Sequence, residues 1–79
     1  MNQQTKLKKI WKKKGYFIIN LIIVTPVGVP DLICLKPAHV VFVESKEKLD
    51  KLSPLQRVVL SKLTKLGFDC YVNDKKYTL

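Results

Sequence analysis

Residues 53–67 carry both a start and a stop signal for one helix, and this helix separates two segments of β-type sequence. Ser53 is a favoured N-cap residue, Pro54 suits the first helical position, and Gln56 can complete a capping box with Ser53. Gly67 is typical of the residue after a helix end. A helix that joins two strands of one sheet normally makes them parallel. The sequence therefore predicts a parallel pair on either side of this helix.

The remaining segments predict a small α/β domain of order αβββαβ, with a mixed sheet flanked by helices. We expect a first helix over residues 2–14, with Leu7, Ile10 and Trp11 on one face. Strands are predicted at 16–25, 31–36, 39–46 and 68–74, the first buried on both faces, and the tail can add an edge segment. In the second helix, the predicted buried stripe is Leu55, Val58, Val59, Leu63 and Leu66.

The length and the cysteines limit the kind of protein. Seventy-nine residues (1–79) make one domain with a marginal core, so oligomerisation is an expected source of stability. Cys34 and Cys70 lie in strand-like apolar runs and form no CxxC or Cys/His cluster. We interpret them as buried, reduced thiols rather than a disulfide or metal ligands, which favours a cytoplasmic location.

The charge of the chain favours a polyanionic partner. Fifteen Lys and Arg against six Asp and Glu give a net charge of +9. Nucleic acid is the first candidate and an anionic membrane surface the second. The proposed phosphate contacts, with Trp11 and Tyr16 interleaved, are Lys8, Lys9, Lys12, Lys13 and Lys14. A solvated helix face is the alternative interpretation of these lysines.

A secretory signal is a further alternative for the basic stretch and the apolar residues 16–24 that follow it. No small-x-small cleavage pattern follows, and Asn20 interrupts the apolar run. The run is also shorter than the roughly 20 residues that a membrane-spanning helix needs. We therefore expect no membrane partner.

Two of the few acidic residues, Asp31 and Glu44, lie at the outer ends of a strongly apolar stretch. A hairpin centred on Pro37 and Ala38 places them opposite each other, within about 5 Å between Cβ atoms. Pro-Ala is a poor two-residue turn, so a longer symmetric loop is the alternative. The expected pairs are Lys36–His39, Leu35–Val40, Ile33–Phe42 and Asp31–Glu44.

Two facing carboxylates predict a metal site. Lys46 shares a face with Glu44 because side chains alternate along a strand, but one amine offsets only part of the repulsion. A hard cation with oxygen ligands, Mg²⁺ or Mn²⁺, resolves the conflict and can promote phosphodiester hydrolysis. Lys46 could position water or stabilise charge on the phosphate. Alternatively, Asp31 satisfies turn amides and Glu44 pairs with Lys46.

The motif Gly28-x-Pro30-Asp31, then Glu44-Ser45-Lys46, then a helix opening with Ser53-x-x-Gln56, resembles the virus-type replication-repair nuclease (VRR-NUC) family of PD-(D/E)xK nucleases. The resemblance covers residues 28–74. It implies a restriction-endonuclease-like fold and a metal-dependent DNA endonuclease. Asp31, Glu44 and the Ser45 carbonyl would be metal ligands, Lys46 the catalytic lysine, and Gln56 would orient water or phosphate. Small viral members are implied to be dimers that cut branched DNA, which suggests a phage protein in the host cytoplasm.

One departure from this pattern keeps a second function open. The family often has a glutamate on its first helix, whereas the first thirty residues here contain no acid, and Gln3 or Gln4 stands in its place. The alternative is a non-catalytic nucleic-acid-binding module on a nuclease scaffold. His39, at the hairpin tip, is expected to be a surface residue rather than a ligand.

Overall fold

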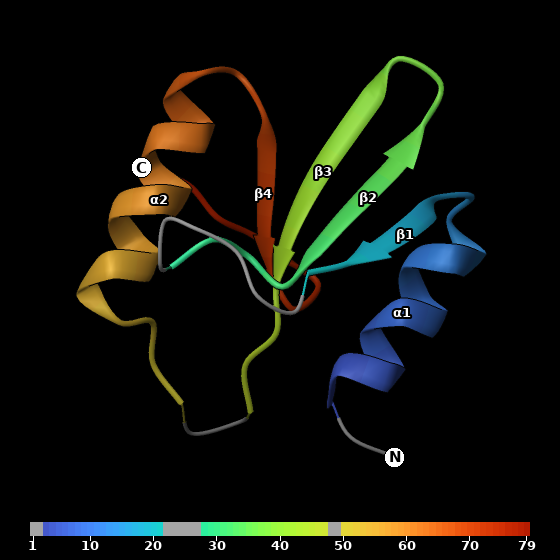
Figure 1. Cartoon of the computed structure of the whole chain (residues 1–79), viewed down its shortest axis with the longest axis horizontal. Helices are drawn as coiled ribbons and strands as arrows, with labels where there is room; N and C mark the ends of the chain where they lie inside the picture. The colour runs from blue at the N-terminus through green and yellow to red at the C-terminus, as the bar shows by residue number, and fades with distance from the viewer. Residues whose placement is uncertain (1–2, 22–27, 48–49) are drawn as a thin grey trace.

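The computed structural model describes residues 3–21, 28–47 and 50–79, which form a mixed sheet with a helix on each face (Figure 1). This architecture confirms the predicted α/β class. The elements are α1 (Gln3–Lys13), β1 (Phe17–Asn20), β2 (Leu32–Lys36), β3 (His39–Glu44), α2 (Pro54–Lys65), β4 (Asp69–Val72) and β5 (Lys75–Lys76). Part of the strand predicted at 16–25 falls on residues 22–27, outside the described residues.

The five strands lie in sequence order, and each neighbouring pair is antiparallel except β3 and β4. The parallel pair confirms the prediction from the intervening helix, and β5 is the expected edge segment. The predicted hairpin register is also confirmed, from Lys36 opposite His39 to Ile33 opposite Phe42. Pro37 and Ala38 do form a two-residue turn, because Ala38 adopts a positive φ of 58°.

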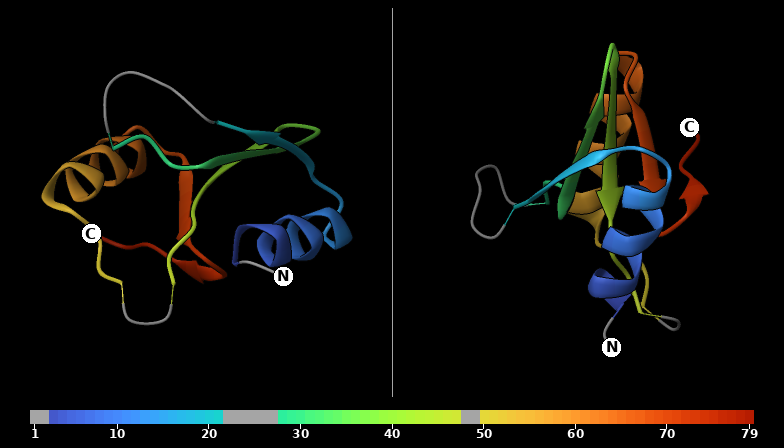
Figure 2. Two further views of the ribbon diagram at one scale, coloured as in Figure 1. Left: turned by 60° about the horizontal axis from the view of Figure 1, so that its bottom comes forward. Right: turned by 90° about the vertical axis from the view of Figure 1, so that its right-hand side faces the viewer.

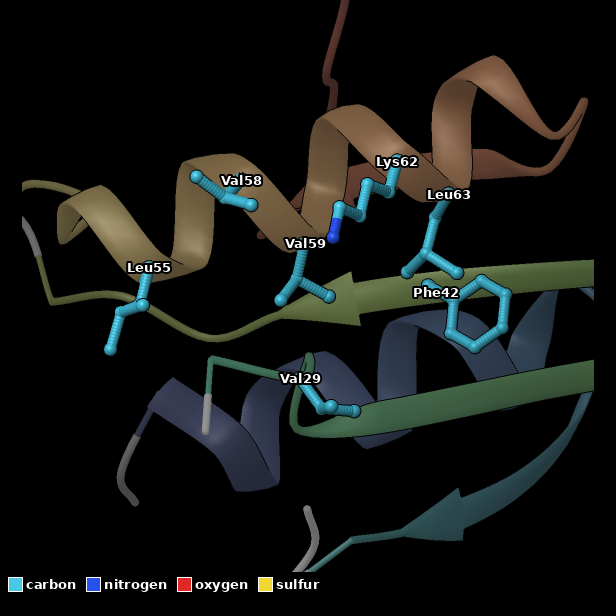
Figure 3. A pocket seen from close by; sticks show the side chains of 7 residues that line it. All are labelled: Val29, Phe42, Leu55, Val58, Val59, Lys62 and Leu63. Carbon is cyan, nitrogen blue, oxygen red and sulfur yellow. The ribbon is translucent and has the colours of Figure 1, made fainter. Parts of the chain in front are cut away.

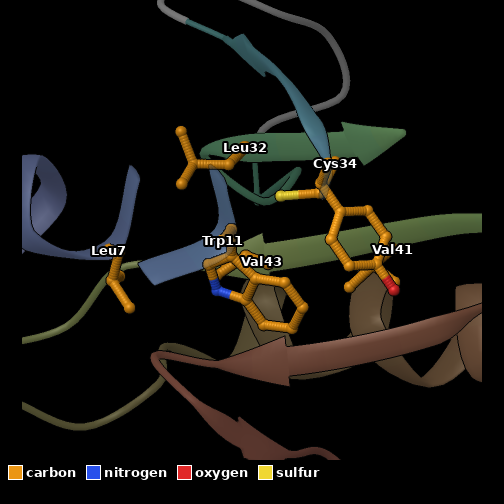
Figure 4. Close-up of a cluster of buried hydrophobic side chains, with 7 residues drawn as sticks. Leu7, Trp11, Leu32, Cys34, Val41 and Val43 are labelled. Carbon is orange, nitrogen blue, oxygen red and sulfur yellow. The ribbon is translucent and has the colours of Figure 1, made fainter. Parts of the chain in front are cut away.

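The main core lies between α1 and the sheet (Figure 4). Trp11, which is 2% exposed, has edge-to-face contacts with Tyr16 and Tyr71, at ring-centroid distances of 5.4 and 4.8 Å. Ile10, expected on the buried face, is 38% exposed. The cluster comprises Leu7, Trp11, Tyr16, Leu32, Cys34, Val41 and Val43. Cys34 in this cluster and Cys70 beneath α2 are both buried and free, as predicted.

The predicted buried stripe of α2 is only partly correct, since just Val59 and Leu63 of its five residues are half-buried. The buried residue is Leu60, whereas Leu55, Val58 and Leu66 are exposed. The helix packs over β4, where the Leu60 carbonyl lies 3.9 Å from the Cys70 thiol. Leu55 and Val58 therefore lie on a flank of α2 that β4 does not cover. Figure 2 shows α2 on the other side of the sheet from α1.

The prediction that the first strand is buried on both faces is also wrong. β1 is an edge strand, and Phe17 and Ile19 on its outer face are exposed. Only Ile18 packs against the core on the α1 side. Because α2 covers the opposite edge of the sheet, this face of β1 stays partly exposed among the described residues. Neither described helix is long and apolar enough to cross a membrane.

Candidate functional site

Asp31 and Glu44 lie at the open end of the β2–β3 hairpin, just beyond its last ladder pair, Leu32 and Val43. The backbone carbonyl of Asp31 accepts a 2.7 Å hydrogen bond from the Leu21 amide, which continues the pairing with β1. Glu44 ends β3 and is 4% exposed, and it is the one charged side chain among the described residues that is buried. The sheet therefore supports both carboxylates at one edge of its apolar core.

The Asp31 carboxylate fixes the chain that follows Glu44. Its Oδ2 atom accepts a 2.9 Å hydrogen bond from the Ser45 amide, fourteen residues further along the chain. This bond crosses from the start of β2 to the end of β3. Asp31 thus does satisfy an amide, as in the alternative interpretation, but the amide belongs to the E-x-K segment rather than to a local turn.

The electrostatics of Glu44 reflect its burial and its neighbours. The pKa of Glu44 is raised from 4.5 to about 7, mainly by burial and next by the nearby Asp31 carboxylate, whereas Lys46 acts in the opposite direction. Asp31 and Lys46 are therefore both close enough to influence this carboxyl group. A carboxyl group with a pKa near neutrality exchanges its proton readily for a cation when one is available.

Gln56 bridges the helix cap and the carboxylate. Its Oε1 atom accepts a 2.9 Å hydrogen bond from the Ser53 amide, and its Nε2 donates a 3.0 Å bond to Glu44 Oε2. The Ser53 hydroxyl in turn accepts from the Gln56 amide, at 3.1 Å, which completes the capping box. The Gln56 side chain therefore makes both contacts at once. Its bond to the Ser53 amide holds the side-chain amide in the orientation that presents Nε2–H to Glu44.

Gly28 brings α2 close to the loop that carries Asp31. A Cβ at this position would lie 2.9 Å from both the backbone carbon and oxygen of Leu55, so only glycine fits. The φ of Gly28, +98°, also belongs to the left-handed region. Because Leu55 precedes Gln56, this close approach sets the distance between the Gln56 side chain and the two acids.

The backbone of Lys46 is held by a residue that the sequence analysis did not identify. The Lys46 amide donates to Asn73 Oδ1 at 2.9 Å, and Asn73 Nδ2 donates back to the Lys46 carbonyl at 3.0 Å. "Asn-Asp" after a strand is a local turn signal. No local pattern indicates that the same side chain reaches a residue 27 positions away.

The chemistry of the proposed donor set suits one hard cation. Asp31 and Glu44 would supply carboxylate oxygens, the Ser45 carbonyl would add a third oxygen, and Mg²⁺ commonly completes its shell with water. Within the described ranges, no three or more His, Cys, Asp or Glu side chains gather into a metal-binding group. Gln4, considered as a substitute for the absent acid, donates instead to Asn20 Oδ1 at 3.2 Å.

The basic residues of α1 lie on the far side of the sheet from α2. Lys9, Lys12, Lys13 and Lys14 are exposed and Lys8 is half-buried. The amine of Lys14 lies 4.5 Å from the centroid of the Trp11 ring. The expectation that Trp11 and Tyr16 interleave with these lysines as DNA contacts is wrong, since both rings are buried in the core.

His39 lies away from the two acids. Its Nδ1 is 2.8 Å from the Tyr16 hydroxyl, and its Nε2 is 3.0 Å from Asp69 Oδ2. Lys76 also contacts Asp69, at 3.4 Å. The ring therefore joins the segment between α1 and β1 to β4, and its role is structural in this arrangement.

An apolar groove lies between α2 and the sheet (Figure 3). Its volume is about 400 Å³, and Lys62 is its one charged lining residue. The others are Val29, Phe42, Leu55, Val58, Val59 and Leu63. With no acid or other polar catalytic group in its lining, the groove is distinct from the carboxylate site.

Comparison with known proteins adds three findings. The family model of the VRR-NUC domain matches residues 22–74, more than half of the chain. A solved structure described as a VRR_NUC domain superposes with a TM-score of 0.75 at 27% sequence identity, covering 87% of this chain and 76% of its own. No curated protein matches the sequence. The catalytic and ligand roles of the individual residues stay predictions.

Proposed function

Because the chain belongs to the VRR-NUC domain family, we propose that it is a metal-dependent DNA endonuclease that hydrolyses phosphodiester bonds. The observation that carries this proposal is the environment of Glu44. A carboxylate that is 4% exposed lies beside a second carboxylate and accepts a hydrogen bond from Gln56. Such a group is costly to bury for stability alone, and it suits a bound cation.

In the proposed mechanism, Asp31, Glu44 and the Ser45 carbonyl hold Mg²⁺, for which Mn²⁺ can substitute. When bound there, the ion would supply Lewis-acid chemistry to the phosphate and the attacking water. Lys46 places its ammonium group against the developing negative charge of the phosphate and orients the attacking water. Gln56 keeps the Glu44 carboxylate in one orientation through its 3.0 Å hydrogen bond. Each role is a positioning or electrostatic one, and no covalent intermediate with the protein is required.

The α1 lysines would bind the DNA backbone. Three of the five proposed residues are exposed on α1, and Lys14 is exposed directly after it. Contacts of this kind weaken as salt rises because counterion release into a more concentrated salt solution gains less entropy. We expect Lys12→Gln to reduce the salt dependence of DNA affinity, measured by fluorescence anisotropy over a salt series. Lys65→Gln, on α2, is the matched control and should leave the slope unchanged.

We propose a homodimer that acts on branched DNA, with the apolar groove as the contact between subunits. A second copy is the occupant that fits best, because copies of a chain with charge +9 repel unless they meet where charge is sparse. Lys62 is the one charged residue in the lining of the groove, and the exposed Leu55 and Val58 also line it. Two sites related by two-fold symmetry suit symmetric cuts in two strands.

Buried free thiols suit a reducing compartment such as the cytoplasm of a host cell.

The test is cleavage of three labelled substrates, a four-way junction, a fork and a linear duplex, in EDTA, Mg²⁺ or Mn²⁺. We expect cutting only with metal, with preference for the branched substrates. Glu44→Gln should abolish cutting and retain DNA binding, whereas Glu47→Gln, an exposed acid three residues further, should retain both. Cutting by the Glu44→Gln protein would contradict the assignment of the site.

A non-catalytic DNA-binding module is the second candidate. It is favoured by the two-acid site, since Gln4 contacts Asn20 and the first thirty residues contain no acid. The same assay separates the candidates. A binding module binds the junction in EDTA and cuts no substrate in any metal.

A further inference from the structure

We propose that Asn73 is a positioning residue for the E-x-K segment, in which its side-chain amide takes the place of a peptide group of β4. This inference rests on the proposed function, since Lys46 is the residue whose placement it governs. It concerns the backbone of Ser45 and Lys46, which begins where β3 ends.

The parallel pairing of β3 and β4 reaches its last ladder pair at Glu44 and Val72. The Asn73 amide still donates to the Glu44 carbonyl at 2.8 Å. In a continued parallel ladder, the next amide and carbonyl on the β3 side, those of Lys46, would pair with backbone groups further along β4. The chain instead turns back at residues 73–74, because Val72 pairs with Lys75 in the β4–β5 hairpin.

The Asn73 side chain supplies the two missing partners. Its Oδ1 accepts from the Lys46 amide at 2.9 Å, as a backbone carbonyl would, and its Nδ2 donates to the Lys46 carbonyl at 3.0 Å, as a backbone amide would. The side-chain amide thus extends the pairing one step beyond the end of β4. Asparagine suits the position because one amide carries both a donor and an acceptor, and the residue tolerates its φ of 57°.

Two adjacent residues of the proposed active site are therefore fixed from both sides. The Ser45 amide is held by Asp31, and the Lys46 peptide groups are held by Asn73. These bonds set the direction of the Ser45 carbonyl and the origin of the Lys46 side chain. Without them the segment would leave the sheet after Glu44, and the amine would sample positions away from the phosphate.

The principal variant is Asn73→Gly, which accepts the positive φ and lacks the amide. Asp74→Gly, at the next residue of the same turn, is the matched control for added flexibility. Asn73→Asp keeps the acceptor for the Lys46 amide but replaces the donor to its carbonyl. Circular dichroism and thermal melting of the full chain establish that each variant is folded.

The first readout is hydrogen exchange at the Lys46 amide, followed by NMR without metal or DNA. We expect exchange about tenfold faster in Asn73→Gly, roughly the value of one hydrogen bond of ordinary strength. Asp74→Gly should match the wild type, and Asn73→Asp should restore part of the protection. Unchanged exchange in Asn73→Gly would overturn the proposal.

The second readout separates chemistry from binding. In single-turnover cleavage of the four-way junction with Mg²⁺, we expect Asn73→Gly to lower the rate constant about tenfold, while junction affinity in EDTA changes less than about twofold. Equal loss of rate in Asp74→Gly would overturn the positioning role. If the wild type cuts nothing, the proposed endonuclease fails, and the exchange result alone still decides whether Asn73 holds Lys46.

Discussion

At the scale of single residues, the site depends on side chains that make two contacts at once. Gln56 caps α2 and also donates to Glu44, and Asp31 faces Glu44 while it holds the Ser45 amide. The unusual member is Glu44, because burial raises its pKa to about 7. Its charge is therefore unfavourable in the folded protein until a cation binds.

This unfavourable charge makes stability depend on pH. The pKa of Glu44 rises from 4.5 to about 7 on folding, so between these values the folded state binds the extra proton. The free energy of unfolding consequently falls as pH rises across this window, and the group is most favourable below it.

We therefore expect metal-free Glu44→Gln to melt several degrees above the wild type at pH 8, since 1 kcal/mol corresponds to roughly 4–8 °C in a domain of this size. Near pH 4.5 the variant should lose this advantage. Thermal melts in EDTA at both pH values measure it, with exposed Glu47→Gln as control. Adding Mg²⁺ should raise the melting temperature of the wild type and leave that of Glu44→Gln unchanged. A difference in melting temperature that is independent of pH would contradict the explanation.

At the scale of elements, the site depends on where α2 begins relative to the loop before β2. The capping box fixes the first turn of α2, and Gly28 lets this turn approach the loop that carries Asp31. The two acids come from the ends of neighbouring strands, so their separation follows from the hairpin register. The distance from Gln56 to these acids follows from the contact at Gly28.

Two glycines with nearly equal φ allow this contact to be tested. Gly28→Ala and Gly67→Ala both force alanine into the left-handed region, at +98° and +100°, but only Gly28 has backbone atoms within 3 Å of the added carbon. Both variants should lose about 1–3 kcal/mol from strain, and Gly28→Ala should lose a further ~1–3 kcal/mol from overpacking. Urea unfolding measures the difference. Equal losses would show that α2 moves away from the loop at little cost.

At the scale of the whole molecule, the two faces of the sheet are covered unequally. The face toward α1 encloses the aromatic core, whereas α2 covers only the β4 side of the other face. Phe17, Ile19 and Val58 are left exposed as a result. An apolar surface of this kind, in a chain of 79 residues, is typical of an interface.

We expect Val58→Glu to convert the proposed dimer to a monomer by placing a charge in the groove, while the far-UV circular dichroism spectrum stays unchanged. Arg57→Glu adds the same side chain one position away, outside the groove lining, and should remain dimeric. Size-exclusion chromatography with light scattering measures both masses. A wild-type protein that is monomeric at micromolar concentration would contradict the proposed interface.

Local sequence was sufficient for the features that depend on neighbouring residues. Ser53, Pro54 and Gln56 predicted the start of α2, because a helix cap is completed within one turn. Period-two alternation and a short turn fixed the hairpin register, and with it the placement of Asp31 and Glu44 at the same end. The family motif lies within these same segments, which is why it could be identified from the sequence.

The tertiary structure alone decided which apolar residues are buried and which distant residues meet. The stripe that includes Val58 has helical period, but the period does not reveal that α2 lies over β4 and leaves this flank uncovered. Trp11 also has a helical period, but the period does not reveal that its ring packs in the core against the sheet, away from the exposed lysines of α1. Asn73 reaches Lys46 across 27 residues because two strands end side by side. Propensity and period act over a few residues, whereas such contacts follow from packing of the whole sheet.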